Sequence, residues 1–302
     1  MGTAGAVRAS PPRHVQRQRP APADPDDGDP LQEGLVMTNE AIAQGWLDAH
    51  WFLNRYGVKT RGDLRPEAWA YDMGIEIIEA DLDGASAQLI RLADLVQIVL
   101  PTRITEYVAR RFAIVHELYH FLKRHPSLSA TMLCKPKWLR GTSRNLHAFE
   151  RGANAFGGAV LLPEFLLRKR CEVSPVSLDV PWQIAKEYDV SILTSAIRFV
   201  ELSSERCAAV FSKDGLVKWI ARSDTFTRPI AETGRIHRDS VAWDFFATGK
   251  LDDRDQPIPA AAWFDTSANV DIIEHSTCRP DYGTVLSLLW VPEAVGARLG
   301  MP

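Results

Sequence analysis

The sequence has few cysteines and no spacing that would link them. Its 302 residues include four, and no two of them form a C-x-x-C pair. This pattern fits neither a cysteine zinc site nor a disulfide framework. The four are Cys134, Cys171, Cys207 and Cys278. We therefore expect reduced thiols in a cytoplasmic protein.

Long apolar runs and a large net charge are also absent. No run approaches the roughly 20 apolar residues that cross a bilayer, and no apolar stretch follows the N-terminal arginines as in a signal peptide. We expect a chain that neither spans a membrane nor is secreted. The 35 Lys and Arg nearly balance the 38 Asp and Glu, for a formal charge of −3. Net charge therefore neither favours nor excludes a nucleic-acid partner.

Aliphatic residues are scarce at the N-terminus, where Pro, Arg, Asp and Ala dominate. Such a stretch buries too little surface to offset the entropy of ordering it, so we expect disorder over residues 1–36. The remaining chain is long enough for a core and an appendage. We expect a core at 37–170, a helical segment at 171–205 and an α+β domain at 206–302.

Periodicity predicts helices and strands in both halves. A helix from Asn39 ends near Gly57, a short helix ends near Gly74, and a strand pair closes at Pro101. A helix of about twenty residues ends before Pro126, and another is stopped by Pro163. Beyond residue 205 the pattern changes to strands, including a hairpin around "KDG" and a buried strand "YGTVLSLLWVP".

The motif with the clearest chemistry is "HELYH" on the predicted helix before Pro126. His116 and His120 are four residues apart, so their imidazoles lie on one helix face and can bind one metal ion. Such an ion lowers the pKa of a bound water to about 7. Glu117 is placed to take that water's proton, which predicts a catalytic base.

A third metal ligand is needed, and His125, His147 and Glu150 are the candidates. His125 is two and a half turns after His116, on the opposite face, which favours a role at the helix end or in solvent. Glu150 precedes a stripe of small residues that would let two helices approach closely. The stripe, which favours Glu150, comprises Ala153, Asn154, Gly157 and Gly158.

Together, "RRFAIVHELYH" and "ERGANAFGGAVLLP" resemble the ImmA/IrrE family of metallo-endopeptidases over about residues 39–198. The resemblance implies a zincin-like α+β core with His116, His120 and Glu150 as metal ligands, Glu117 as general base and Asn154 bracing a ligand histidine. It also implies one Zn²⁺ per chain, with Mn²⁺ as the alternative. Gly152, Gly157 and Gly158 depart from residues common in the family, at positions that do not bind metal.

The family also implies a substrate class, because several members cleave a helix-turn-helix repressor and so release stress-response or mobile-element genes. We therefore expect a cytoplasmic endopeptidase acting on such a protein partner. The alternative is a DNA- or protein-binding regulator whose metal site is structural or degenerate. An oxyanion donor is also required; Tyr107, Tyr119 and His147 are candidates, as is an arginine of the connector that precedes Glu150.

The segment "IAKEYDVSILTSAIR" has the layout of a helix-turn-helix. Asp189 can adopt left-handed geometry, and Ser191 is a suitable N-cap. For DNA reading the second helix offers Arg198 and little else, so we favour a structural or docking role. The strands after residue 205 form an α+β domain with a candidate sensory or regulatory role.

Overall fold

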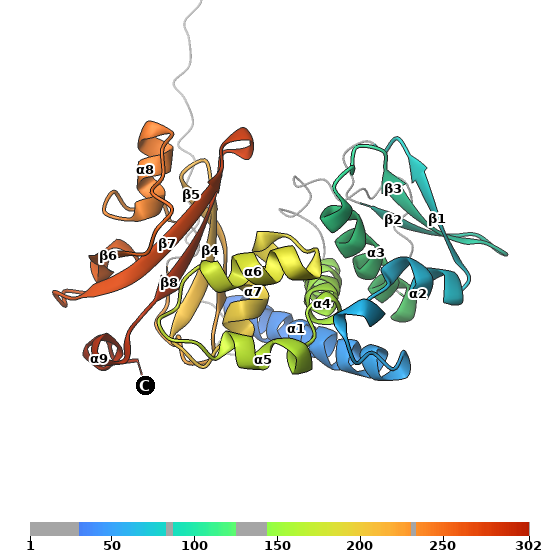
Figure 1. The fold of residues 1–302 in the computed structure, drawn as a ribbon, viewed down its shortest axis with the longest axis horizontal. Coiled ribbons are helices and arrows are strands. Elements are labelled where there is room, and N and C mark those ends of the chain that lie inside the picture. Colours follow the sequence, from blue (N-terminus) through green and yellow to red (C-terminus); the bar gives the residue numbers. More distant parts are fainter. Residues whose placement is uncertain (1–29, 83–86, 125–143, 231–233, 302) are drawn as a thin grey trace, which may run out of the picture.

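The computed structural model describes residues 30–82, 87–124, 144–230 and 234–301. The side chains of residues 30–39 and 144–147 also lie outside what it describes. Two sheets flank a central group of helices (Figure 1). The α+β class is confirmed.

The first helix, α1 (Pro30–Arg55), is longer than expected. It begins inside the segment predicted to be disordered, whereas residues 1–29 lie outside the described part. It ends two residues before Gly57, which has a φ of +61° that a glycine adopts without strain. Along its length α1 packs against α4 (Arg144–Leu161), and α4 in turn packs against α3 (Tyr107–Leu122). We call α3 the metal helix, because it carries the candidate ligands His116 and His120.

A small sheet covers the metal helix from the other side. Its strands are β1 (Ile75–Ala80), β2 (Gln88–Arg91) and β3 (Val96–Pro101), in the order β1-β3-β2. The expected strand pair is the antiparallel hairpin β2–β3, while β1 runs parallel to β3. α2 (Pro66–Asp72) leads into β1, and β2 is an edge strand among the described residues.

The metal helix, α3 (Tyr107–Leu122), has an apolar stripe that is fully buried. Ile114, Val115 and Leu118 have no exposed surface, so this face anchors the helix in the core. The next helix, α4, ends before Pro163, as predicted. His125 and Cys134 fall in residues 125–143, outside the described part.

Three further helices follow α4. They are α5 (Glu164–Cys171), α6 (Asp179–Tyr188) and α7 (Ile192–Leu202). The predicted break is confirmed: Asp189 adopts the left-handed conformation, with φ 52° and ψ 54°. Ser191 caps α7, its hydroxyl accepting the Thr194 N–H at 3.0 Å. The local chemistry that predicted two helices therefore also defines where each ends.

The C-terminal part contains a five-stranded antiparallel sheet in the order β5-β4-β8-β7-β6. Its strands are β4 (Cys207–Lys213), β5 (Leu216–Arg222), β6 (Gln256–Pro259), β7 (Asp271–Arg279) and β8 (Thr284–Trp290). α8 (Val241–Thr248) packs on β7 and β8, and α9 (Glu293–Gly296) follows the last strand. The predicted hairpin is β4–β5, and the predicted buried strand is β8.

The larger sheet lies between two hydrophobic cores. Ala209, Leu286 and Leu288 on one face belong to the same core as the metal helix. Val210, Val285 and Leu289 on the other face pack with α8 and the C-terminal segments. The sheet is thus joined to the helices through a shared core, and the domain boundaries at 170 and 205 stay a prediction. Within the described ranges, no helix is both long and apolar enough to cross a bilayer.

Candidate metal centre

His116, His120 and Glu150 meet in the groove between α3 and α4. The two histidines project from one face of α3, one turn apart, as their spacing requires. Glu150 comes from α4, the helix that packs beside α3. The three side chains are 15%, 12% and 25% exposed, so the group is accessible from solvent at one side. Of the residues that the structure describes, these three form a cluster able to hold a metal ion.

The distances between the three groups fit a tetrahedral ion. The two Nε2 atoms are 3.1 Å apart, and the carboxylate oxygens of Glu150 lie 3.3 Å from Nε2 of His116 and 3.5 Å from Nε2 of His120. An ion with bonds of about 2.0–2.1 Å holds tetrahedral ligands roughly 3.3–3.4 Å apart. The donor atoms therefore need little movement to share one ion.

Asn154 determines which nitrogen of His116 faces this point. Its Oδ1 lies 3.1 Å from Nδ1 of His116 and can only accept a hydrogen bond, so Nδ1 carries the proton. The lone pair is then on Nε2, the atom directed at Glu150 and His120. In the absence of a metal, burial alone lowers the pKa of His116, but the hydrogen bond to Glu150 and the charges of Glu117 and Glu150 raise it overall.

Glu117 is buried beside the metal cluster, with 9% of its surface exposed. Burial raises the pKa of its carboxyl to about 7, and the negative charge of Glu150 adds to this. The charge of His116 and a hydrogen bond from the Leu89 N–H act in the opposite direction. A carboxyl with a pKa near neutrality can both accept and return a proton, which is the property a general base requires.

The hydrogen bond from the Leu89 N–H to Glu117 places the edge strand β2 beside the site, an arrangement that the side-chain pattern does not predict. The Leu92 N–H donates to the Leu95 carbonyl at the end of the hairpin, so Gln88 and Ile90 bond to β3. Leu89 and Arg91 then direct their backbone groups to the open edge. The sequence carries no side-chain signal for this contact, because the hydrogen-bond donor to Glu117 is the backbone amide of Leu89.

Arg91 holds the same strand to the end of the metal helix. Its Nη2 donates to the carbonyl oxygens of His120 at 2.9 Å and of Phe121 at 3.1 Å. These carbonyls are among the last of α3, where a cation also opposes the helix dipole. These bonds thus hold the open edge of β2 against α3, the helix that carries Glu117.

The close approach of the helices depends on Gly157, as expected, and also on Gly45 and Gly152, but not on Gly158. A Cβ at Gly45 of α1 would lie 2.5 Å from the Gly152 carbonyl oxygen, and one at Gly152 would lie 2.8 Å from the Tyr119 hydroxyl. Gly157 packs on Phe112 of α3, whereas a Cβ at Gly158 would meet nothing within 4 Å. Gly152, noted only as a departure from the family, is therefore a packing residue.

Two candidate oxyanion donors, Tyr107 and Tyr119, lie on α3 itself. Tyr107 begins α3, roughly 13 Å along the axis from His116, and is 57% exposed. Tyr119 is buried between α1 and α4; burial and the nearby Asp48, with which it shares a hydrogen bond, raise its pKa to about 12. Tyr107 is nine residues before His116 and so lies on the opposite face of α3, which contradicts that candidate. Tyr119 is three residues after His116, and its role as an oxyanion donor stays a prediction. The side chain of His147 lies outside the described residues.

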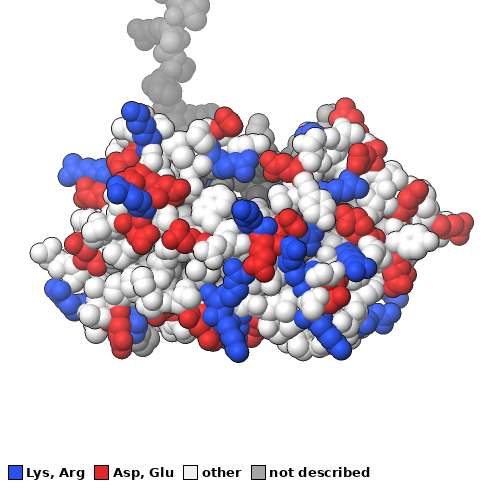
Figure 2. Space-filling model, viewed as in Figure 1, with Lys and Arg blue, Asp and Glu red and all other residues white. Residues whose placement is uncertain are grey.

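The prediction that Arg198 could contact DNA is also wrong. Arg198 is 6% exposed; its Nε donates to the Leu162 carbonyl at 3.1 Å, and its Nη1 pairs with Glu201 at 3.0 Å. No residue of α7 is exposed, because the helix is enclosed by its neighbours and the larger sheet. On the face shown in Figure 2, side chains of both signs are interspersed. The side chains of α7 are thus packed within the fold, and the structural or docking role of the helix pair stays a prediction.

Comparison with known proteins agrees with this geometry. Residues 70–199 match a peptidase family described as the IrrE N-terminal-like domain. A solved structure described as a Mycobacterium tuberculosis transcriptional regulator has a similar fold, with a TM-score of 0.56 and 13% identity. The alignment covers 87% of this chain and 82% of that one. No curated protein matches the chain in sequence.

Proposed function

We propose that this chain is a zinc-dependent endopeptidase that cleaves a specific protein partner, in keeping with the match of residues 70–199 to the IrrE N-terminal-like peptidase family. The observation that carries the proposal is the convergence of His116, His120 and Glu150 beside the buried Glu117. Two nitrogens and a carboxylate oxygen form a donor set that binds Zn²⁺ more tightly than Mn²⁺, so zinc is the preferred ion.

In peptide hydrolysis Glu117 and Asn154 have different roles. A divalent metal in such a site supplies Lewis acidity, which activates a water molecule and polarises a peptide carbonyl. Glu117 accepts the proton of the attacking water and delivers it to the departing amine. Asn154 keeps the Nε2 lone pair of His116 directed at the site.

The edge of β2 gives a way to hold the substrate. An extended peptide can pair with an open strand edge through backbone hydrogen bonds. The Leu89 carbonyl and the backbone groups of Arg91 are directed to this edge, next to Glu117. A segment bound there would present its backbone to the catalytic carboxylate, so we expect cleavage within an extended or locally unfolded stretch of the partner.

The substrate we propose is a helix-turn-helix repressor, controlling stress-response or mobile-element genes in the cytoplasm. This rests on the family resemblance, and the free thiols of Cys171, Cys207 and Cys278 fit that compartment. The alternative is a regulator that binds DNA or protein through a structural or degenerate metal site. The buried, enclosed α7 gives no support to DNA reading, and a purely structural site has no use for a carboxylate at Glu117.

The deciding experiment compares the wild type with Glu117→Gln, using Glu106→Gln, an exposed glutamate that precedes α3, as a control. Bound metal is measured by elemental analysis, and cleavage is measured on the helix-turn-helix repressor encoded beside the gene and on unfolded casein. We expect Glu117→Gln to retain metal and lose cleavage of both substrates, and the control to retain both properties. Cleavage by Glu117→Gln at the wild-type rate would reject the peptidase proposal.

A further inference from the structure

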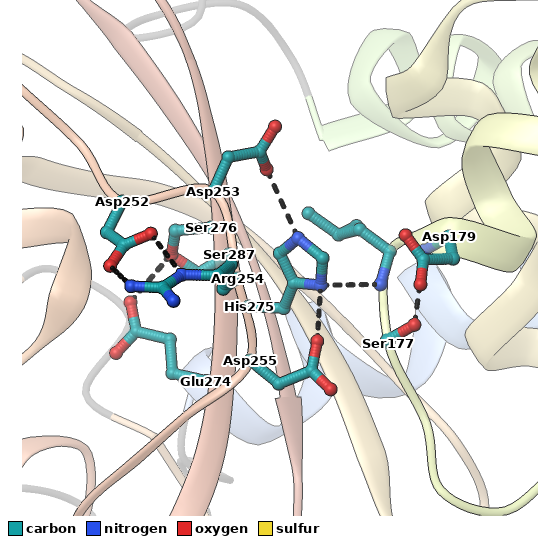
Figure 3. Close-up of polar contacts among 11 residues, drawn as sticks. Ser177, Asp179, Asp252, Asp253, Arg254, Asp255, Glu274, His275, Ser276 and Ser287 are labelled. Atoms are coloured by element: carbon teal, nitrogen blue, oxygen red, sulfur yellow. Dashed lines mark hydrogen bonds and ion pairs between the residues drawn. The ribbon is translucent and has the colours of Figure 1, made fainter.

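His275 is a buried histidine with a carboxylate at each ring nitrogen (Figure 3). It lies on β7 opposite Leu288, on the sheet face that packs against the helices, and its side chain is 5% exposed. Nε2 is 3.1 Å from Oδ1 of Asp253, and Nδ1 is 2.9 Å from Oδ1 of Asp255. Both aspartates belong to the loop that precedes β6.

Nδ1 of His275 has a second partner of the opposite kind. The backbone N–H of Leu178, the residue that caps α6, lies 3.2 Å from the same nitrogen. A ring nitrogen carries either a proton or an in-plane lone pair, so it cannot donate to Asp255 and accept from Leu178 at once. The proton on Nδ1 therefore decides which of the two partners is bonded.

We propose that protonation of His275 controls the hydrogen bond that joins the larger sheet to the start of α6. We call this contact, from the Leu178 N–H to Nδ1 of His275, the joint. In the neutral ring, Nε2–H donates to Asp253 and Nδ1 accepts the Leu178 N–H. In the charged ring, the two N–H groups donate to Asp253 and Asp255, and the buried Leu178 N–H loses its acceptor. Because an unsatisfied buried N–H is unfavourable, protonation weakens the attachment of α6 to the sheet. The proposal does not rest on the proposed peptidase activity.

The charged groups around the ring come from the loop before β6, the start of α6 and β7. Asp253 and Asp255 face the ring from the loop before β6, and the single arginine of that loop, Arg254, is bonded to Asp252. From the helical side, the segment nearest the ring carries Asp179, whose N–H is bonded to the Ser177 hydroxyl. Glu274 adjoins His275 in the chain but lies on the opposite face, bonded to the α8 amides of Val241 and Ala242. Cys278 of β7 also lies near Asp253: burial raises the pKa of the Cys278 thiol, and the charge of Asp253 adds to this.

The joint lies at one end of a helix whose other end is bonded to the metal helix. α6 has ten residues, about 15 Å, between Leu178 and Tyr188. The Tyr188 carbonyl accepts a hydrogen bond from Nη1 of Arg111 in α3 at 2.6 Å. A change at His275 therefore acts on an element in direct contact with the helix that carries His116 and His120.

The test follows the Leu178 amide and the His275 ring by NMR in the full-length protein labelled with ¹⁵N-leucine and ¹⁵N-histidine. The titration covers about pH 5 to pH 8, the range in which an imidazole changes charge. We expect the neutral ring to carry its proton on Nε2, and the exchange protection of Leu178 to fall about tenfold or more as His275 becomes charged. A neutral ring protonated on Nδ1, or Leu178 protection that stays constant through the His275 titration, would overturn the proposal.

Variants separate the joint from general effects of pH. His275→Asn places an amide oxygen near the position of Nδ1 and does not titrate, so Leu178 protection should become independent of pH. Asp255→Asn removes the negative charge that faces Nδ1 of the charged ring, so it should shift the His275 midpoint to lower pH without changing the exchange protection of Leu178 at high pH. His237→Asn changes an exposed histidine that also has an aspartate beside it and should leave the wild-type profile unchanged. Unchanged profiles in both of the first two variants would reject the joint.

Discussion

Across the contact between α3 and α4, Nδ1 of His116 donates a hydrogen bond of 3.1 Å to Oδ1 of Asn154. The bond sets the tautomer of a candidate metal ligand from a second helix. Asn154→Ala removes it, so we expect about 10- to 100-fold weaker zinc binding with the fold intact. Zinc affinity by competition with a chromophoric chelator checks this, with the exposed Asn54→Ala of α1 as control. Equal affinities for wild type and Asn154→Ala would contradict it.

Glu150 is the carboxylate that completes the cluster, so Glu150→Ala should abolish stoichiometric zinc binding. A ligand that binds the folded state alone raises its stability, by about 4 kcal/mol at a thousandfold excess over Kd. Chelation should therefore lower the Tm of the wild type and leave that of Glu150→Ala unchanged. Glu164→Gln, which changes an exposed glutamate of α5, should behave like the wild type. A Glu150→Ala protein that still responds to chelation would exclude Glu150 as a ligand.

Glu117 should make the metal-free protein less stable as pH rises. Its folded-state pKa of about 7 lies above the ordinary value of 4.5, so the folded state binds more protons between these two values. Stability is then lost as pH rises through that window, by roughly 3 kcal/mol at most. Denaturant unfolding in a chelator at about pH 5 and pH 8 should show a smaller decrease for Glu117→Gln than for the wild type. Because Glu117 and His116 interact, the difference between the two proteins reports on the titration of both residues together. Equal decreases in wild type and Glu117→Gln would contradict the raised pKa of Glu117.

The ion pair between the buried Arg198 and the partly buried Glu201 should matter for stability. Burial raises the pKa of Glu201, and bonds from Arg198 and Trp46 oppose this effect. Arg198→Ala leaves the carboxylate buried without its main partner, so we expect a loss of about 3–5 kcal/mol in unfolding free energy. The exposed Arg168→Ala of α5, paired with Glu164, should cost at most about 1 kcal/mol. Chemical denaturation of both variants checks this, and equal losses would refute the buried role.

The glycines of α1 and α4 offer a paired test of helix packing. Gly45→Ala places a methyl group 2.5 Å from a backbone oxygen of α4, so we expect a loss of about 1–3 kcal/mol. Gly158→Ala meets open space and should stabilise its helix by up to about 1 kcal/mol. Thermal unfolding of the two variants measures both the expected loss of stability and the expected gain. If Gly45→Ala matched the wild type, the close contact of α1 with α4 would be refuted.

Local patterns predicted most of the elements around the site. The spacing of His116 and His120 predicted a shared helix face, and Asp189 and Ser191 marked the break between α6 and α7. These features depend on residues within one or two turns of each other, where backbone geometry alone relates sequence to structure. The start of α1 differed because composition indicates average behaviour over a window and does not set the first helical residue.

The sequence by itself determined the motif on α3, the capping of α7 and the hairpins β2–β3 and β4–β5, because neighbouring residues carry that information. Only the tertiary structure decided that Glu150 and Asn154 reach His116, that the Leu89 amide bonds to Glu117, and that Arg198 is buried. Each of these depends on packing between segments far apart in the chain. Burial and charge pairing are set by such distant neighbours, which no local periodicity records.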